Sequence, residues 1–149
     1  MGRLELTRII DAPIGVVFRT VADISSFSKA IPHIVKIEFL SDIESGIGTR
    51  FRETRLVKGK EVSNDLEVTE YAENDRVRLV ADSHGTVWDS VFTVKSQRGR
   101  TELTLVMDAR PYKLLPKVIY PLIRRMVEKS IEQDLDSVKT FCEMPPKPN

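Results

Sequence analysis

The chain has 149 residues, of which 23 are Lys or Arg and 22 are Asp or Glu, so its formal net charge at pH 7 is +1. This length suffices for one domain with a buried core, and the even mixture of charges excludes the basic patch of a nucleic-acid-binding protein. A single cysteine, Cys142, excludes an internal disulfide and is typical of a reducing compartment. Because neither a signal-peptide core nor a membrane-spanning apolar run is found, we expect a cytoplasmic protein.

One strand and two short helices are predicted for the first thirty residues. Alternating side chains over Leu4–Ile10 indicate a strand. Asp11 is expected to cap a helix over Pro13–Ala22, whose first turn suits proline. Ser25 is expected to cap a second short helix that ends at Ala30.

The hydrophobic period changes to two after the second helix and predicts six consecutive strands. These strands are expected over Ile34–Ser41, Thr49–Val57, Glu61–Tyr71, Arg76–Ser83, Thr86–Ser96 and Thr101–Arg110. Lys58–Lys60 is expected to be a turn, and the connections at His84–Gly85 and Gln97–Arg100 have hairpin length, so neighbouring strands are expected to be antiparallel.

The last long stretch of the chain predicts one amphipathic helix. Apolar residues recur at steps of three and four from Leu115 to Cys142, and Pro121 is expected to kink the axis. The apolar stripe is wide up to Val127 and narrow beyond Ser130. The wide half is interpreted either as part of the core, which we favour, or as the roof of a ligand cavity.

The order of these elements predicts an α+β fold, with a curved antiparallel sheet of about seven strands wrapped around a long C-terminal helix. We expect one ligand-binding domain over residues 1–143 and a disordered, proline-rich tail over residues 144–149. A pocket is expected between the sheet, the long helix and the helix pair.

Five segments in this order resemble the polyketide cyclase/dehydrase and lipid-transport family of the START-like superfamily, which has the helix-grip fold. They read IIDAPIGVVFRTVADISSFSKAIPHIVKIEFL, GIGTRFRE, LEVTEYAENDRVRL, GRTELTLVMDARP and LIRRMVEKSIEQDLDSVKTFCE. The resemblance implies a hydrophobic cavity for a lipid, sterol, polyketide or quinone-like molecule. Some members of the family are cyclases or dehydratases, some carry lipids or quinones, and others act through protein partners. The aromatic-proline-tryptophan-cysteine signature of quinone carriers is missing around Pro32.

Strand alternation predicts which side chains face this cavity. We expect the face with Trp88 to point inward on its strand because it carries the large aromatic residues. The candidate ligand-binding residues are Phe51, Trp88, Ser90, Phe92, Leu105 and Met107 on the strands and Leu115, Ile119, Leu122 and Met126 on the helix.

Candidate acids and bases are few. If Phe51 points inward, Glu53 and Arg55 enter the cavity and must pair there or meet a polar ligand group; a solvated strand end with both on the surface is favoured. Glu53, His84 and Asp89 are the candidate catalytic residues, although His84 is better explained as an exposed turn residue. The sequence has no nucleophile-base pair, metal cluster or phosphate loop, so we expect no metal and no cofactor.

Three functions stay open, and binding or transport of a small hydrophobic ligand is preferred. The alternatives are a polyketide cyclase or dehydratase that uses a pocket acid or base, and a partner-modulating protein whose cavity is incidental. An exposed apolar patch over Ile31–Ile34 or at the helix start would favour the last of these. The basic residues interleaved in KLLPKVIYPLIRR leave a transient contact with a membrane surface open, and no oligomeric state is predicted.

Overall fold

The computed structural model describes residues 2–144 of the chain. Seven antiparallel strands form a single sheet in the order β1-β7-β6-β5-β4-β3-β2. The strands are β1 (Gly2–Ile10), β2 (Ile34–Phe39), β3 (Arg50–Val57), β4 (Lys60–Ala72), β5 (Arg76–Ser83), β6 (Thr86–Gln97) and β7 (Arg100–Pro111). The helices are α1 (Ile14–Ala22), α2 (Ile24–Ala30) and α3 (Leu114–Glu143).

The predicted fold class is confirmed, and the strand bounds agree with the prediction to within about two residues. Strands β2 to β7 follow one another as hairpins, while β1 pairs with β7 at the other edge of the sheet. The register of β2 against β3 shifts between Ile34 and Lys36, which marks a bulge in this edge strand. Of the predicted tail, residues 145–149 lie outside the described part of the chain.

Both predicted helix caps are wrong. Pro13 is the residue that precedes α1, and Asp11 lies too far upstream for its carboxylate to bind the free amides of the first turn. The second helix starts at Ile24 after Asp23, so Ser25 belongs to its first turn. Neither α1 nor α2 has a side-chain hydrogen bond that caps its first turn. The stability of these two helices therefore depends on the apolar faces that they bury.

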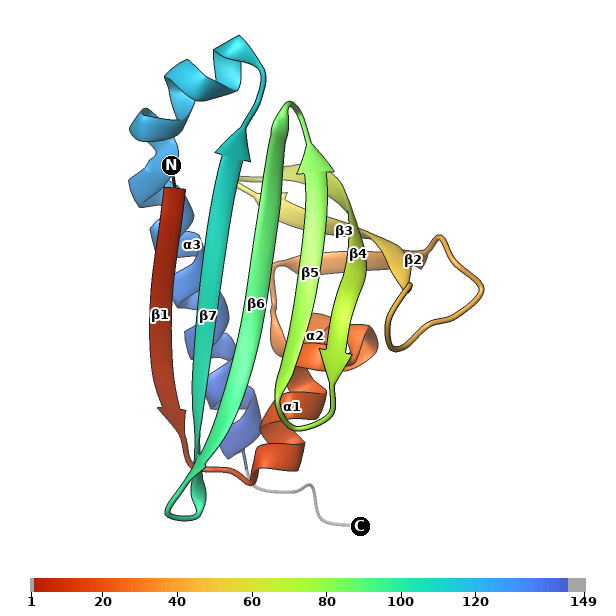
Figure 1. The fold of residues 1–149 in the computed structure, drawn as a ribbon, viewed down its shortest axis with the longest axis vertical. Coiled ribbons are helices and arrows are strands. Elements are labelled where there is room, and N and C mark those ends of the chain that lie inside the picture. Colours follow the sequence, from red (N-terminus) through yellow and green to blue (C-terminus); the bar gives the residue numbers. More distant parts are fainter. Residues whose placement is uncertain (1, 145–149) are drawn as a thin grey trace.

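The core lies between the concave face of the sheet, the helix pair and the second half of α3 (Figure 1). This core includes Val17 and Val21 of α1 together with Ile131, Leu135 and Val138 of α3, and each of these side chains is buried. The spacing of the three α3 residues follows the i, i+4, i+7 pattern of one helical face. This half of α3 holds the helix against the sheet and sets the position of the site described below.

The first half of α3 does not pack as predicted. Figure 1 shows its first turns reaching past the ends of β1 and β7 before the helix bends and follows the sheet, and Pro121 lies within the helix. Leu115 and Leu122 are 67% and 81% exposed. Except for Val127 at its end, which lines the cavity described below, the wide apolar stripe is therefore neither part of the core nor a cavity roof, because it points away from the sheet. No helix of residues 2–144 is long and apolar enough to cross a membrane.

Tyr120 is the buried side chain that holds this half of the helix to the sheet, and Arg124 adds a hydrogen bond of 3.2 Å to the backbone oxygen of Arg3 on β1. Its ring lies 6.1 Å from that of Trp88 on β6, in an edge-to-face arrangement. The ring also covers Gly2 of β1 so closely that a methyl group on Gly2 would lie 2.4 Å from the tyrosine oxygen. The hydroxyl of Tyr120 is buried and has no hydrogen-bond partner within residues 2–144, and burial raises its pKa.

We expect Tyr120→Phe to raise the free energy of unfolding by about 1 kcal/mol, because it removes a buried hydroxyl that pairs with nothing. Urea unfolding followed by fluorescence of the single tryptophan measures the change. Tyr112→Phe is the control, since the Tyr112 hydroxyl is exposed and donates to Asp82 at 2.7 Å. The Tyr112→Phe variant should show no increase in the free energy of unfolding. A loss of stability in Tyr120→Phe would show that the buried hydroxyl has a partner after all.

Candidate ligand-binding cavity

A cavity of about 260 Å³ lies between the concave face of the sheet, the two short helices and the middle of α3. Most of its wall is apolar and comes from every strand between β3 and β7. The apolar lining residues are Val21, Ile24, Phe27, Phe51, Leu66, Leu79, Ala81, Trp88, Phe92, Leu105, Met107, Val127 and Ile131. The polar ones are Glu53, Arg55, Asn64, Ser90, Ser130 and Asp134.

The strand candidates from the sequence all line this cavity. They are Phe51, Trp88, Ser90, Phe92, Leu105 and Met107, so the inward faces deduced from alternation agree with the structure. Their role in binding a ligand stays a prediction.

The four helix candidates do not line the cavity. Leu115, Ile119, Leu122 and Met126 are 37% to 81% exposed, because the first half of α3 turns its apolar side away from the sheet. The helix contributes Val127, Ser130, Ile131 and Asp134 instead, from the turns that pack on the sheet.

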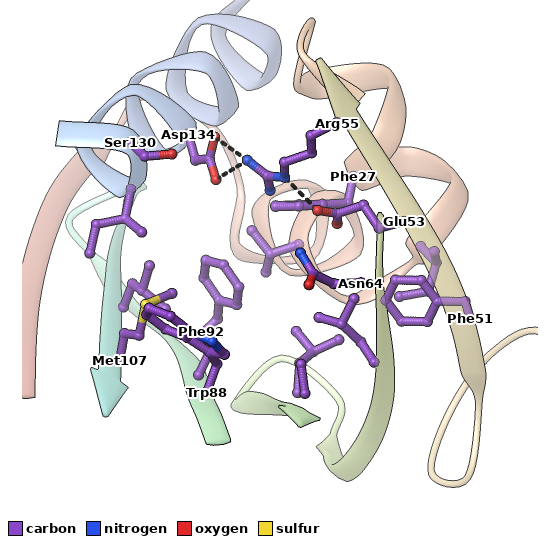
Figure 2. A pocket seen from close by; sticks show the side chains of 18 of the residues that line it. Phe27, Phe51, Glu53, Arg55, Asn64, Trp88, Phe92, Met107, Ser130 and Asp134 are labelled. Carbon is purple, nitrogen blue, oxygen red and sulfur yellow. Dashed lines mark hydrogen bonds and ion pairs between the residues drawn. The ribbon is translucent and has the colours of Figure 1, made fainter. Parts of the chain in front are cut away.

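The charged side chains of the cavity gather at one end of it (Figure 2). Trp88, Phe92 and Met107 gather at one end, and the Phe92 ring meets Phe27, which lies near Glu53, edge to face at 5.9 Å. Glu53, Arg55, Ser130 and Asp134 gather at the other end. A molecule inside the cavity would therefore meet an apolar wall at one end and charged groups at the other.

The charged end is built on Arg55 of β3. Its Nη1 donates to both carboxylate oxygens of Asp134, at 3.0 and 2.9 Å, and its Nε donates to Glu53. Glu53 is 7% exposed and Asp134 9% exposed. The favoured interpretation of this strand, with both charges on the surface, is wrong: Phe51 points into the core, and the period of two carries Glu53 and Arg55 inward with it.

Burial controls the electrostatics of this cluster. It raises the pKa of Asp134, and Glu53 adds to the effect, while the Arg55 guanidinium opposes it. Desolvation also acts against the charge of Arg55, but the two carboxylates outweigh it and raise the arginine pKa. With both acids ionised, two carboxylates face one guanidinium, so the cluster has a formal net charge of −1. Because the folded protein holds the Asp134 proton more tightly than the unfolded chain, this group contributes stability at low pH that is lost as the pH rises through its folded pKa.

Asp134 was missed at the sequence level, although a signal for it exists. Val127, Ile131 and Val138 mark the packed face of α3, and Asp134 occupies the same face at the helical spacing of three and four. A carboxylate on the buried face of an amphipathic helix needs a buried cation. Arg55, whose strand phase was left open, is that cation.

Of the three candidate catalytic residues, the structure brings only Glu53 to the cavity. His84 is exposed in the turn between β5 and β6. Asp89 lies on the other face of the sheet from Trp88, where Arg78 binds it with distances of 2.8 and 2.6 Å. The hydrogen bonds from Arg78 lower the pKa of Asp89, so it is an ion-paired carboxylate rather than a proton donor. Within residues 2–144, no group of three or more His, Cys, Asp or Glu side chains could hold a metal ion.

The sequence matches a family described as polyketide cyclase / dehydrase and lipid transport over residues 1–143. The chain belongs to this family. The resemblance inferred from the five sequence segments is thereby confirmed. No curated protein matches the sequence.

Solved structures with the same fold share little sequence with this chain. A START superfamily protein from Mycobacterium smegmatis is 15% identical with a TM-score of 0.78, and the match covers 96% of this chain and 98% of that one. TTHA0849 from Thermus thermophilus is 17% identical with a TM-score of 0.75, covering 93% and 94%. StfQ, a di-domain aromatase/cyclase from the steffimycin biosynthetic pathway, is 12% identical with a TM-score of 0.75, covering 95% of this chain and 50% of StfQ. At these identities the likeness establishes the helix-grip fold alone.

Proposed function

We propose that this protein binds a small, mostly apolar molecule that carries an uncharged hydrogen-bonding group at one end. The family and the fold fit either hydrophobic ligand binding or a cyclase-like role. The observation that carries the proposal is the division of the cavity into an apolar end and a charged end (Figure 2). Ligand pockets typically combine apolar walls with a few polar groups that fix orientation.

The volume of the cavity limits the size of the ligand. At about 260 Å³ it lies just below the range of roughly 300 to 1,000 Å³ that is typical of small-molecule pockets. Met107 at the apolar end has an unbranched, adaptable side chain, which suits a wall that adjusts to its ligand. We therefore expect a single-chain or few-ring molecule rather than a two-chain lipid.

The charge of the polar end limits the chemistry of the ligand. Glu53 and Asp134 can accept a hydrogen bond from a ligand hydroxyl, and within residues 2–144 Nη2 of Arg55 makes no hydrogen bond and can donate to a carbonyl. A carboxylate or phosphate on the ligand would add a further negative charge to a buried cluster whose net charge is already −1. The site therefore favours alcohols, phenols and ketones over fatty acids.

A matched pair of ligands tests this preference. Competition against a hydrophobic fluorescent probe at neutral pH should show decanol binding about tenfold more tightly than decanoate, a difference of about 1.4 kcal/mol. Asp134→Asn, which leaves Arg55 paired with Glu53, should shrink the ratio toward one. Asp136→Asn is the control, because Asp136 is exposed and binds Arg8 at 2.7 Å.

Two results would contradict the proposal. If the protein takes up neither the probe nor decanol, and native mass spectrometry of gently purified protein finds no bound molecule, the cavity is not a binding site. If decanoate binds more tightly than decanol, the charged end does not select the ligand in the way proposed.

The second candidate is a cyclase or dehydratase. One observation favours it, namely a buried carboxylic acid with a raised pKa at the edge of an apolar cavity, as general acids require. In this case Asp134 or Glu53 transfers the proton, and neither His84 nor Asp89 takes part. With a small polyketone substrate, Asp134→Asn should then lower kcat while leaving KM nearly unchanged, whereas a pure binding protein shows no turnover to lose.

A further inference from the structure

The first half of α3 has an apolar outer face, which consists of Leu114, Leu115, Val118, Ile119, Leu122 and Met126. Leu114 and Leu122, the most exposed of the six, are 79% and 81% exposed. Large apolar side chains that are contiguous on a surface mark an interaction site rather than ordinary surface composition.

The outer face has the opposite polarity to the rest of the helix. Its members recur at steps of one, three and four, so they share one side of the helix, and Tyr120 is buried on the other side. In the second half of α3 the continuation of the same outward side is polar, with Gln133, Asp136 and Thr140. The outward side of one helix thus changes from apolar to polar near its middle, and packing against the sheet does not explain the apolar part.

The charged residues of the segment that carries the outer face have one sign. Residues 112–127 contain Lys113, Lys117, Arg124 and Arg125 and no acidic residue. All four basic side chains belong to exposed residues. Arg124 also donates from Nη2 to the backbone oxygen of Arg3 at 3.2 Å. An exposed apolar helical face with lysine and arginine on the remaining sides of the helix is the pattern of helices that lie in the interface of an anionic bilayer.

We propose that the first half of α3 docks this protein on an anionic lipid bilayer. The helix lies along the surface, with its outer face at the boundary between head groups and acyl chains and its basic side chains at the lipid phosphates. The same charges argue against a second copy of the chain as occupant, because pairing two outer faces would bring two groups of four cations together. The proposal stands on its own, whether or not the cavity holds a ligand.

Vesicle binding by the full chain tests the proposal. The protein is expected to bind vesicles of three parts phosphatidylcholine to one part phosphatidylglycerol at least about tenfold more tightly than vesicles of phosphatidylcholine alone, and added salt should remove the difference. The double variant Lys117→Gln/Arg125→Gln should bind the anionic vesicles roughly 30-fold less tightly, since each basic residue near the surface contributes about 1 kcal/mol.

Two further variants distinguish the loss of the apolar outer face from a general effect of added negative charge. Leu115→Asp/Leu122→Asp should abolish vesicle binding without unfolding the protein, because both side chains are largely exposed. Val35→Asp/Ile47→Asp makes the same change of charge at residues that are 50% and 62% exposed on β2 and in the loop before β3. In Figure 1 this region lies across the molecule from the start of α3. The affinity of the Val35→Asp/Ile47→Asp variant for anionic vesicles should therefore stay within a few-fold of that of the unaltered protein.

Three outcomes would overturn the proposal. In the first, the unaltered protein fails to bind anionic vesicles at low salt. In the second, the Leu115→Asp/Leu122→Asp variant binds them as tightly as the unaltered protein does. In the third, the lipid-free protein sediments as a dimer that this variant converts to a monomer, and the outer face is then a contact between two copies.

Discussion

Arg55→Met is expected to lower the free energy of unfolding by about 3 to 5 kcal/mol at neutral pH, because it leaves two buried carboxylates without their cation. Arg55 joins Asp134 on α3 to Glu53 on β3, so both acids lose a charged partner at once. Urea unfolding followed by tryptophan fluorescence gives the loss. This is the largest effect on stability that we expect from one charged side chain of the protein.

The loss should depend on pH in a defined direction. Burial already raises the pKa of Asp134 in the presence of Arg55, and removal of the guanidinium takes away the group that opposes this shift. A carboxyl group with a raised folded pKa contributes stability at low pH that disappears as the pH rises through that pKa. The variant should therefore be closest to the unaltered protein at acidic pH and furthest from it at neutral pH.

Arg52→Met is the matched control for Arg55→Met. Arg52 lies on the same strand and binds Asp65 through two hydrogen bonds of 2.7 and 3.1 Å, but this pair is exposed. Its loss should cost no more than about 1 kcal/mol. The triple variant Glu53→Gln/Arg55→Met/Asp134→Asn should recover much of the stability lost in Arg55→Met, and equal losses in the two arginine variants would show that the Arg55 cluster is effectively solvated.

Ser90→Phe is expected to weaken binding of a hydrophobic probe at least about a hundredfold, equivalent to about 2.8 kcal/mol. Ser90 lines the cavity between Leu79 on β5 and Met107 on β7, so a phenyl group at this position occupies the space that a ligand needs. Probe titration measures the loss. The fold should survive, because the new ring enters an existing cavity rather than a packed core.

Val91→Phe is the control for Ser90→Phe. Val91 is the next residue on β6 and points to the opposite face of the sheet, where it is partly exposed. This variant should bind the probe as the unaltered protein does. If Ser90→Phe fails to fold, the smaller Ser90→Leu serves instead, and unchanged binding in a folded Ser90 variant would place the ligand site outside this cavity.

The strands were predictable because each one faces the core on one side and a different environment on the other. Alternation along β6 and β7 therefore identified Trp88, Phe92, Leu105 and Met107 as inward residues. It was harder to predict which face of β3 points inward, because Glu53 and Arg55 are charged residues of the kind that is normally exposed. Their burial depends on Asp134, which is about eighty residues away in sequence and close only in the folded chain.

The orientation of the first half of α3 was not predictable from its periodicity. A wide apolar stripe indicates a helix with one apolar face, but it does not specify what that face meets. Tyr120, rather than the leucines, is the anchor of this half, and it packs against Gly2 because that residue has no side chain to exclude the ring. Gly2 and Tyr120 are far apart in the sequence, so no local sequence pattern could predict their contact.

The contact between Tyr120 and Trp88 connects the cavity to the first half of α3. Trp88 is a wall of the cavity, and its ring also meets the residue that fastens the outer half of α3 to the sheet. A bilayer that displaces Tyr120 would thereby alter the cavity wall, and thermodynamic reciprocity then requires an occupied cavity to change the affinity for the bilayer by the same factor. The affinity of the cavity for its ligand would in that case differ between the bilayer-bound and the free protein. The contact between Tyr120 and Trp88 would couple the two binding events.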